Sequence, residues 1–348
     1  MADQPGLLVL HRHRTAAMIL ALETSCDDTC AAVVTADGVI AANVISSQGI
    51  HDRYGGVVPE VASRHHLELI GVVLDDALAR AGVGLEEIGL VAVTGGPGLV
   101  AALLVGVSTA KALAASRGLP LAFVDHLHGH VATSFLAPNP FAPPFLSLVA
   151  SGGHTLLAHV RSPGPDFRVL GQTLDDAAGE AFDKGARLLG LGYPGGAALE
   201  RLARTGDPHA FRFPTASRLR GLDFSFAGLK TALLYRVREL GEGQARARRA
   251  DLAASYQHAI VEALAIRVER ALVQTGLSRL AIGGGVAANG LLRERLSGLG
   301  VELDAPPREL CTDNAAMIAS AARHLPSLPY PDYLGLDVYA TGERALAA

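Results

Sequence analysis

The 348-residue sequence has no tryptophan, only three lysines and only three cysteines. Cys26, Cys30 and Cys311 are odd in number and form no Cys-X-X-Cys pair, which argues against a disulfide framework and favours a reducing cytoplasm. Because lysine is scarce, almost every cation is an arginine, a side chain suited to planar, bidentate recognition of phosphate. The net charge of -4 excludes extensive phosphate coating but permits a local basic patch.

Targeting signals and a phosphate-binding P-loop are also missing. The sequence has no GxxxxGK[ST] motif, so ATP hydrolysis of that type must come from another protein. The uncharged run at 90–110 contains TGGPG, which breaks a regular element, so we expect a buried strand, a turn and a buried helix instead of a membrane span. Residues 1–17 carry HRHR before a short apolar run, without a clear cleavage site. We therefore expect a cytoplasmic protein without a signal peptide or membrane association.

Length and an internal repeat predict two lobes. A chain of 348 residues with 49% apolar residues exceeds what one core usually supports. Residues 18–44 and 145–170 each read as three short strands joined by turns, and VAVTGGPGLVAALL and LAIGGGVAANGLL each read as strand, glycine turn and helix. The proline-rich tract APNPFAPP separates the two halves. This pattern predicts two like α/β domains that face a central cleft.

These features give a domain plan. We expect an N-terminal extension at 1–17, an N-terminal lobe at 18–137, a proline-rich junction at 138–144 and a C-terminal lobe at 145–325. A helical insertion at about 200–260 and a tail at 326–348 complete the plan. Glycine turns ahead of helices expose backbone N–H groups that favour anions, so the cleft is predicted to hold nucleotide phosphates. A single turn of this kind more often serves close packing.

The segment HLHGH places His126 and His130 four residues apart, on one face of a helix. Such a pair offers two nitrogens to one metal ion. The alternative is a polar helix face that carries histidines by chance. His128 lies about 200° around the helix from each of the other two and is not expected to be a ligand.

Eight motifs, in order along residues 18–325, make a family visible: ALETSCDDT, GGPGLVAALLVGVSTAKALA, HLHGH, SGGHT, DDAAGEAFDKGARLLGLGYPGG, FSFAGLKTALL, GGGVAANGLLRERL and CTDNAAMIA. Together they resemble the universal TsaD family, formerly described as glycoproteases. The resemblance implies the duplicated two-lobe fold of actin, Hsp70 and sugar kinases. It also implies transfer of the threonylcarbamoyl group of L-threonylcarbamoyl-AMP to the exocyclic amine of the adenosine 3′ of the anticodon in ANN-decoding tRNAs, with release of AMP.

The resemblance also implies a metal centre. His126, His130 and Asp313 match the family's ligands for one divalent metal, with iron(II) favoured by precedent and zinc compatible with the same donors. Asp313 on its own would be interpreted as the cap of the helix that begins NAAMIASAARHL.

Further positions follow from the same resemblance. Asp183 matches a residue at the ribose of the adenylate, although its spacing to Arg187 also suits an ordinary surface ion pair. The substrate-binding positions that the resemblance implies are Ser151, Gly152, Gly153, His154, Asp183, Gly196 and Asn289. Glu23 is a candidate general base or tRNA-orienting group, and its alternative is a carboxylate that stabilises the loop.

Two other enzyme classes compete with this hypothesis. A small-molecule kinase of the same fold would leave the HxxxH pair without a purpose, and a metalloprotease would need the glutamate of HExxH, which HLHGH lacks. The resemblance further implies tRNA as a partner, together with a shorter paralogous subunit and a P-loop ATPase. Val149 stands where archaeal and eukaryotic members have a tyrosine ligand, so the bacterial form is expected.

Overall fold

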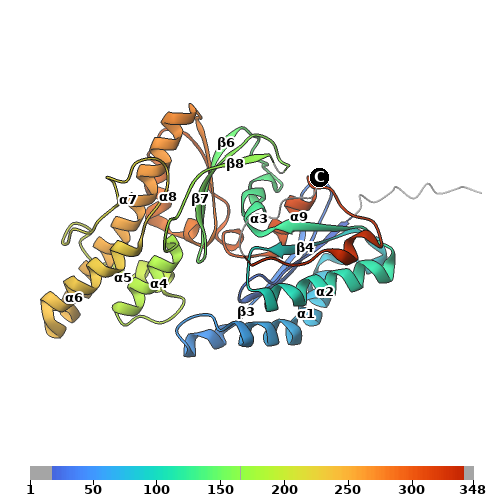
Figure 1. Cartoon of the computed structure of the whole chain (residues 1–348), viewed down its shortest axis with the longest axis horizontal. Coiled ribbons are helices and arrows are strands. Elements are labelled where there is room, and N and C mark those ends of the chain that lie inside the picture. Colours follow the sequence, from blue (N-terminus) through green and yellow to red (C-terminus); the bar gives the residue numbers. More distant parts are fainter. Residues whose placement is uncertain (1–17, 165, 341–348) are drawn as a thin grey trace, which may run out of the picture.

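The computed structural model describes residues 18–164 and 166–340, so the predicted extension at 1–17 lies outside the described residues. Figure 1 shows two α/β lobes side by side. Helices α1 (Pro59–Ala81) and α2 (Val100–Arg117) belong to the first lobe. Helices α4 (Ala178–Leu188), α5 (Gly195–Ala203), α6 (Ala227–Ala247) and α7 (Arg249–Thr275) belong to the second.

The first sheet contains five strands in the order β3-β2-β1-β4-β5. Its strands are β1 (Met18–Glu23), β2 (Asp28–Val34), β3 (Ile40–Ser47), β4 (Ile88–Gly96) and β5 (Leu121–Asp125). β1, β2 and β3 form an antiparallel meander, while β4 is parallel to β1 and β5 is parallel to β4. The central strands are almost continuously apolar because both faces of the sheet are covered.

The second sheet repeats this plan. Its strands are β6 (Phe145–Ala150), β7 (Thr155–Val160), β8 (Phe167–Gln172), β9 (Arg279–Gly283) and β10 (Glu302–Asp304). They follow the order β10-β9-β6-β7-β8. β6, β7 and β8 form an antiparallel meander, while β9 is parallel to β6 and β10 is parallel to β9. The predicted duplication is confirmed, and β6 takes the place that β1 has in the first lobe.

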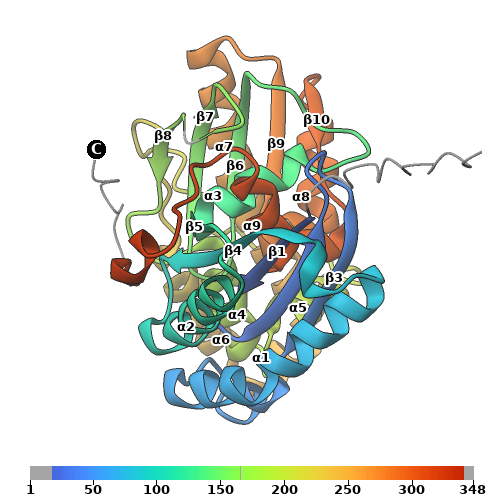
Figure 2. The same ribbon diagram turned by 90° about the vertical axis from the view of Figure 1, so that its right-hand side faces the viewer.

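Two short helices lie between the sheets. α3 (His126–Ala132) follows β5, and α9 (Ala315–Ala322) follows β10 after the 3-10 turn Arg308–Leu310. α9 packs on β1, β2 and α3, while α3 also contacts β6 and β9, and Figure 2 shows the two helices near the centre of the molecule. A Cβ atom at Gly129 would lie 2.8 Å from Cδ1 of Ile318, so a side chain there would force Ile318 to shift, and glycine suits the close approach of α3 to α9.

The core of the second lobe includes part of the predicted insertion. α7 supplies Tyr256 and Arg267, both almost completely buried, and ends at Gly276 in the left-handed conformation that glycine favours. α8 (Gly290–Ser297) follows β9 after a 3-10 turn, as the strand, glycine turn and helix pattern predicted. The predicted lobe and insertion boundaries stay predictions.

The uncharged run at 90–110 forms the predicted strand, turn and helix as β4 and α2. α2 is the one helix in the described ranges that is long and apolar enough, by length and composition, to cross a membrane. It packs against β4 and α1. Only one face is buried, however, since Val100 and Leu104 are exposed by 45% and 43%. The expectation of a buried helix is therefore correct for one face only.

Residues 326–340 form a strap, called here the C-terminal strap, that packs on the first lobe. Leu328 exchanges two backbone hydrogen bonds of 2.9 Å with Leu121 of β5. Tyr333 is completely buried in the same core as β1 and β4. This part of the chain is thus joined to the first lobe by both backbone pairing and apolar packing.

Candidate metal centre

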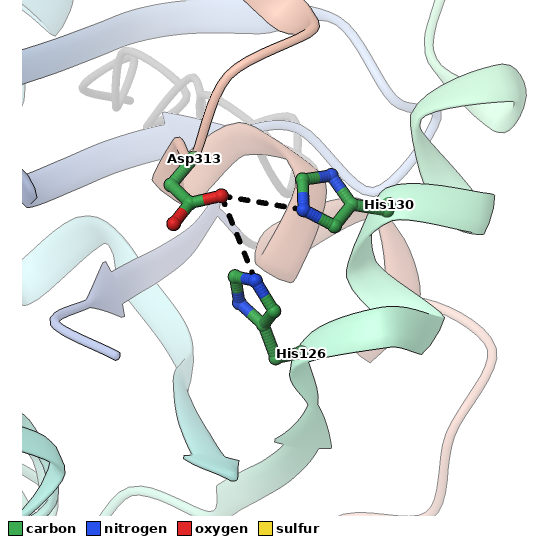
Figure 3. Close-up of side chains that lie close together, drawn as sticks. All are labelled: His126, His130 and Asp313. Carbon is green, nitrogen blue, oxygen red and sulfur yellow. Dashed lines mark ion pairs between the residues drawn. The ribbon is translucent and has the colours of Figure 1, made fainter. Parts of the chain in front are cut away.

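Two side chains of α3 and one from the turn that precedes α9 converge on one point (Figure 3). Oδ1 of Asp313 lies 3.5 Å from Nε2 of His126 and 3.2 Å from Nε2 of His130. One ligand atom from each residue lies within 4.8 Å of the others. The three residues that the sequence suggested as ligands are therefore brought together, although Asp313 is almost 200 residues away in sequence.

The local sequence of α3 sets the direction of both histidines. The carboxylate of Asp125 caps the helix, because its Oδ1 accepts hydrogen bonds of 2.9 and 3.1 Å from the N–H groups of Leu127 and His128. His126 is then the first helical residue and His130 lies one turn later, with ring centroids 4.8 Å apart. The ring of His128 packs instead against Phe167, at 5.3 Å.

Asp313 does not cap its helix. The cap of α9 is Asn314, whose side-chain oxygen accepts a 3.0 Å hydrogen bond from the N–H of Met317. The capping alternative for Asp313 is therefore wrong, because the neighbouring residue already fills that role. Asp313 is left to point at the two histidines.

Glu23 fixes the orientation of His126. It ends β1, is completely buried, and its Oε2 lies 3.0 Å from Nδ1 of His126. Oε2 also accepts a 2.5 Å hydrogen bond from the hydroxyl of Thr94, and Oε1 accepts one of 2.5 Å from the N–H of Ser25. Because a carboxylate only accepts, Nδ1 of His126 carries a proton, which leaves Nε2, on the side of Asp313, as the ring nitrogen that a metal would bind in exchange for its proton.

The charges around Glu23 favour the ionised carboxylate. Burial is the largest influence and raises the pKa of Glu23, but the charge and hydrogen bond of His126, together with the hydrogen bond from Ser25, bring the net pKa below its usual value. Both carboxylate oxygens are engaged by neighbours. This geometry favours the alternative in which Glu23 stabilises the loop, and Glu23 also orients the candidate ligand His126. It argues against a role for Glu23 as general base.

The centre has the properties of a cation site. Among the described residues, Nδ1 of the buried His130 has no hydrogen-bond partner, and its Nε2 faces Oδ1 of Asp313 at 3.2 Å. Burial lowers the pKa of His126, yet Asp313 and Glu23 more than offset this and raise it to about 9. Buried polar atoms without partners require an explanation, and ligation of a metal supplies one. Two imidazoles and one carboxylate fit iron(II) or zinc with coordination positions left for a substrate.

The SGGH turn of the second lobe lies beside this centre. The N–H of Ser151 donates a 2.8 Å hydrogen bond to the carbonyl of His154, which closes the turn. Gly152 and Gly153 are exposed at its tip. The ring of His154 lies 6.5 Å from that of His126, and burial together with His126 and His130 lowers the pKa of His154 to about 4. His154 therefore presents a neutral imidazole at pH 7.

Asp183 joins two helices of the second lobe. Its Oδ1 accepts a 2.7 Å hydrogen bond from the N–H of Gly195 at the start of α5, next to Gly196, and burial raises its pKa. The alternative ion pair with Arg187 is absent from the described ranges, because Arg187 donates instead to the carbonyl of Gly55 in the first lobe. The acidic side chain of Asp183 is thus set against a helix N-terminus.

Asn289 caps α8 and lies beside a cavity. Its Oδ1 accepts a 3.0 Å hydrogen bond from the N–H of Leu292, and its Nδ2 donates to Gln257 at 3.1 Å. Gln257 lines a cavity of about 380 Å³, and so does Gly290, the residue after Asn289. Glu200 and Arg308 line the same cavity. The other predicted substrate positions therefore lie on the second lobe outside the histidine and aspartate cluster.

The sequence analysis missed a buried histidine that supports the ETSCDD turn. Nε2 of His66 lies 2.9 Å from the carbonyl oxygen of Cys26, and its Nδ1 lies 2.8 Å from the hydroxyl of Thr29. The amide of Gln48 is 3.4 Å from the same Nδ1. A signal was present, since His66 stands at the apolar spacing of α1, four residues before the buried Ile70.

Two five-stranded sheets of one topology, with α3 and α9 between them, define a two-lobed α/β protein of the actin, Hsp70 and sugar-kinase class. Solved structures support the fold alone. The chain aligns with component A of (R)-2-hydroxyglutaryl-CoA dehydratase from Acidaminococcus fermentans at a TM-score of 0.55 and 16% identity, over 91% of this chain and 99% of that chain. HypF from T. kodakarensis aligns at 0.56 and 15% identity, over 88% and 47%.

Within this class, the model of the TsaD family, tRNA N6-adenosine threonylcarbamoyltransferase, matches residues 38–320. The chain is 56% identical over 316 residues to the tRNA N6-adenosine threonylcarbamoyltransferase of Anaeromyxobacter dehalogenans (strain 2CP-C). This match covers 88% of this chain and 93% of the relative. The chain is 51% identical over 330 residues to that of Trichlorobacter lovleyi, over 93% and 96%. The chain belongs to the TsaD family, which decides against the kinase and metalloprotease alternatives.

Proposed function

We propose that the chain transfers the threonylcarbamoyl group of L-threonylcarbamoyl-AMP to the exocyclic amine of the adenosine 3′ of the anticodon in ANN-decoding tRNAs. AMP is the leaving group. The observation that supports this reaction is the convergence of His126, His130 and Asp313 beside the SGGH turn, in a chain of this family. An acyl donor held between a cation site and backbone N–H groups is placed for transfer.

The chemistry needs an activated carbonyl, because the lone pair of the adenine amine is delocalised into its ring. We propose that His126, His130 and Asp313 would hold one iron(II) ion, for which zinc is the alternative, and that a metal bound there would supply a Lewis acid for the threonylcarbamoyl oxygens. The exposed glycines of the SGGH turn would offer backbone N–H groups to the oxygen on which negative charge develops. Neutral His154 can share a hydrogen bond with the donor without adding a charge. Glu23 keeps the Nε2 atom of His126 directed at the site.

For the adenosine part of the donor, we propose the second lobe. Asp183 and Gly196 would contact the ribose, and Asn289 would lie near the adenine, which the neighbouring 380 Å³ cavity supports. The carboxylate of Asp183 suits two ribose hydroxyls, because a charged acceptor makes stronger hydrogen bonds than a neutral one. The part of the site that binds the donor is thus proposed to extend away from the metal centre.

Asp183→Ala is expected to weaken binding of L-threonylcarbamoyl-AMP without loss of metal. Hydrogen bonds to charged groups contribute about 1.5 to 3 kcal/mol, so the dissociation constant should rise roughly 10 to 100-fold. Calorimetric titration of a stable donor analogue measures the affinity, and elemental analysis measures the metal. Glu180→Ala is the matched control on the same helix, since Glu180 only pairs with Lys184 at 2.9 Å. If Asp183→Ala lost metal to the same extent as it lost affinity for the donor, the assignment of Asp183 to the ribose would be contradicted.

The partners are proposed on the same basis. Binding of tRNA follows from the activity. A shorter paralogous subunit and a P-loop ATPase are proposed from the resemblance to the bacterial members of the family, and the lack of a P-loop in this sequence agrees with a separate ATPase. A cytoplasmic location, where tRNA is modified, stays a prediction.

The function is tested by a reconstituted transfer reaction. Purified, metal-loaded protein is incubated with synthetic L-threonylcarbamoyl-AMP and an unmodified tRNA transcript that decodes an ANN codon, with and without the two proposed protein partners. We expect threonylcarbamoyl-adenosine by nucleoside mass spectrometry, with AMP in equal amount. A transcript with guanosine in place of the target adenosine should give none. Absence of product from the complete mixture would contradict the proposed function.

A further inference from the structure

The C-terminal strap ends beside the helix that carries the two histidines. The hydroxyl of Tyr339 donates a 2.6 Å hydrogen bond to Oδ2 of Asp125, across 214 residues of sequence. The other oxygen of the same carboxylate, Oδ1, caps α3 through the N–H groups of Leu127 and His128. One carboxylate therefore connects the end of the described chain to the start of α3.

The strap is held in place independently of this hydroxyl. The N–H of Tyr339 donates a 3.1 Å hydrogen bond to the carbonyl of Gly95, and the N–H of Gly98 donates one of 3.3 Å to the carbonyl of Ala340. A Cβ atom at Gly96 would lie 2.3 Å from the carbonyl oxygen of Tyr339, so the glycine turn leaves room for the strap. Lys111 of α2 adds a 3.0 Å hydrogen bond to the carbonyl of Leu334. The Tyr339 side chain is thus delivered to Asp125 by an anchored backbone.

We propose that Tyr339 is a positioning residue for the metal centre and acts through Asp125. The first N–H groups of a helix have no partner within the helix, so their cap decides where the helix begins. The carboxylate of Asp125 caps α3 and is hydrogen-bonded at both oxygens, so it is held in one orientation. This orientation fixes the first turn of α3. His126 is the residue directly after Asp125, and its Nε2 must meet Asp313 from the other lobe. The inference rests on the metal site proposed above.

The geometry makes His126 more dependent on this contact than His130. Glu23 holds the ring of His126 at Nδ1 but leaves its backbone to the cap. His130 lies a full turn further along, where α3 is packed against α9. Loss of the Tyr339 hydroxyl should therefore loosen one ligand of three and weaken metal binding without abolishing it.

The test compares two tyrosine variants of the same strap by titration with Co²⁺ under anoxic conditions, followed by visible absorption. Tyr339→Phe removes the hydroxyl that bonds Asp125. Tyr333→Phe is the matched control, since within the described ranges the buried hydroxyl of Tyr333 has no hydrogen-bond partner. We expect Tyr339→Phe to weaken Co²⁺ binding several-fold, which is less than the roughly 10 to 100-fold cost of losing a group bonded directly to a ligand, and to shift the Co²⁺ absorption bands. Tyr333→Phe should bind Co²⁺ as the unmodified protein does.

A double-variant comparison tests the route of the effect. If Tyr339 acts through Asp125, then Asp125→Ala combined with Tyr339→Phe should bind Co²⁺ no more weakly than Asp125→Ala alone. Unchanged binding in Tyr339→Phe, or losses that multiply in the double variant, would overturn the proposal. Melting of the metal-free variants verifies that each is folded. A different result, in which His126→Ala binds Co²⁺ as well as the unmodified protein, would instead overturn the metal site and its proposed function.

Discussion

His126→Ala and His130→Ala are each expected to lose the bound metal and tRNA modification, while His128→Ala keeps both. The Nε2 atoms of His126 and His130 lie within 3.5 Å of Oδ1 of Asp313, whereas the ring of His128 contacts Phe167. Loss of an outer partner of a ligand costs roughly 10 to 100-fold in affinity or activity, and loss of the ligand itself should cost at least as much. Elemental analysis of protein purified without oxygen measures the first effect, and nucleoside analysis the second.

His128→Ala serves as the control because it separates metal loss from destabilisation. His128 is only 3% exposed, so removal of its ring should leave a cavity and lower the free energy of unfolding by about 2 to 4 kcal/mol. Its melting temperature should therefore fall while its metal content stays full. Full metal content in His126→Ala would contradict the proposed site.

A second large effect is expected at the neighbouring residues Asp313 and Asn314, whose replacement by alanine should have opposite effects on metal content. Asp313→Ala should lose metal, because its carboxylate supplies the ligand of the described cluster that does not come from α3. Asn314→Ala should keep metal but lose about 1 to 2 kcal/mol of unfolding free energy, because the oxygen of Asn314 caps α9 through the N–H of Met317. Metal content and melting temperature, measured together, give the two variants opposite profiles.

The comparison is strict because the two positions are adjacent. Asp313→Asn is a useful third variant, since it keeps the size of the side chain and removes its charge. It should also lose most of the metal, and its melting temperature in the metal-free state should fall at neutral pH, because the protonated, buried His126 loses the charge that pairs with it. Loss of metal in Asn314→Ala, with metal retained in Asp313→Ala, would exchange the two roles and contradict the assignment.

The sequence predicted the architecture well where local rules decide it. Strands β1 to β3 and β6 to β8 are short apolar runs bounded by polar turns, and each glycine turn after β4 and β9 is followed by a helix. The four-residue spacing of His126 and His130 also predicted their shared face, because that spacing depends only on helix geometry. The repeat of one strand and helix pattern in the two halves also predicted that both lobes share one topology.

The remaining features depend on contacts between distant segments. The sequence could not say that Asn314, not Asp313, caps α9, because both residues suit a helix start. Glu23 is 103 residues from His126, and Tyr339 is 214 residues from Asp125, so neither pairing has a local signal. Supporting partners of this kind follow from the three-dimensional packing of the lobes.

The duplicated topology also explains the position of the centre. α3 follows the fifth strand of the first sheet and α9 follows the corresponding strand of the second, and the two helices pack against each other. His126 begins α3, and Asp313 lies two residues before the start of α9. A metal bound there would be held by equivalent points of the two halves. Its binding should therefore stabilise one arrangement of the lobes.

The metal centre is tested most directly by anomalous X-ray diffraction at the iron absorption edge, on crystals of protein purified and loaded with iron(II) without oxygen. The proposed metal centre predicts one strong anomalous peak per chain, bounded by Nε2 of His126, Nε2 of His130 and a carboxylate oxygen of Asp313. Stoichiometric iron with its anomalous peak away from these three side chains, or no bound iron after loading, would contradict it.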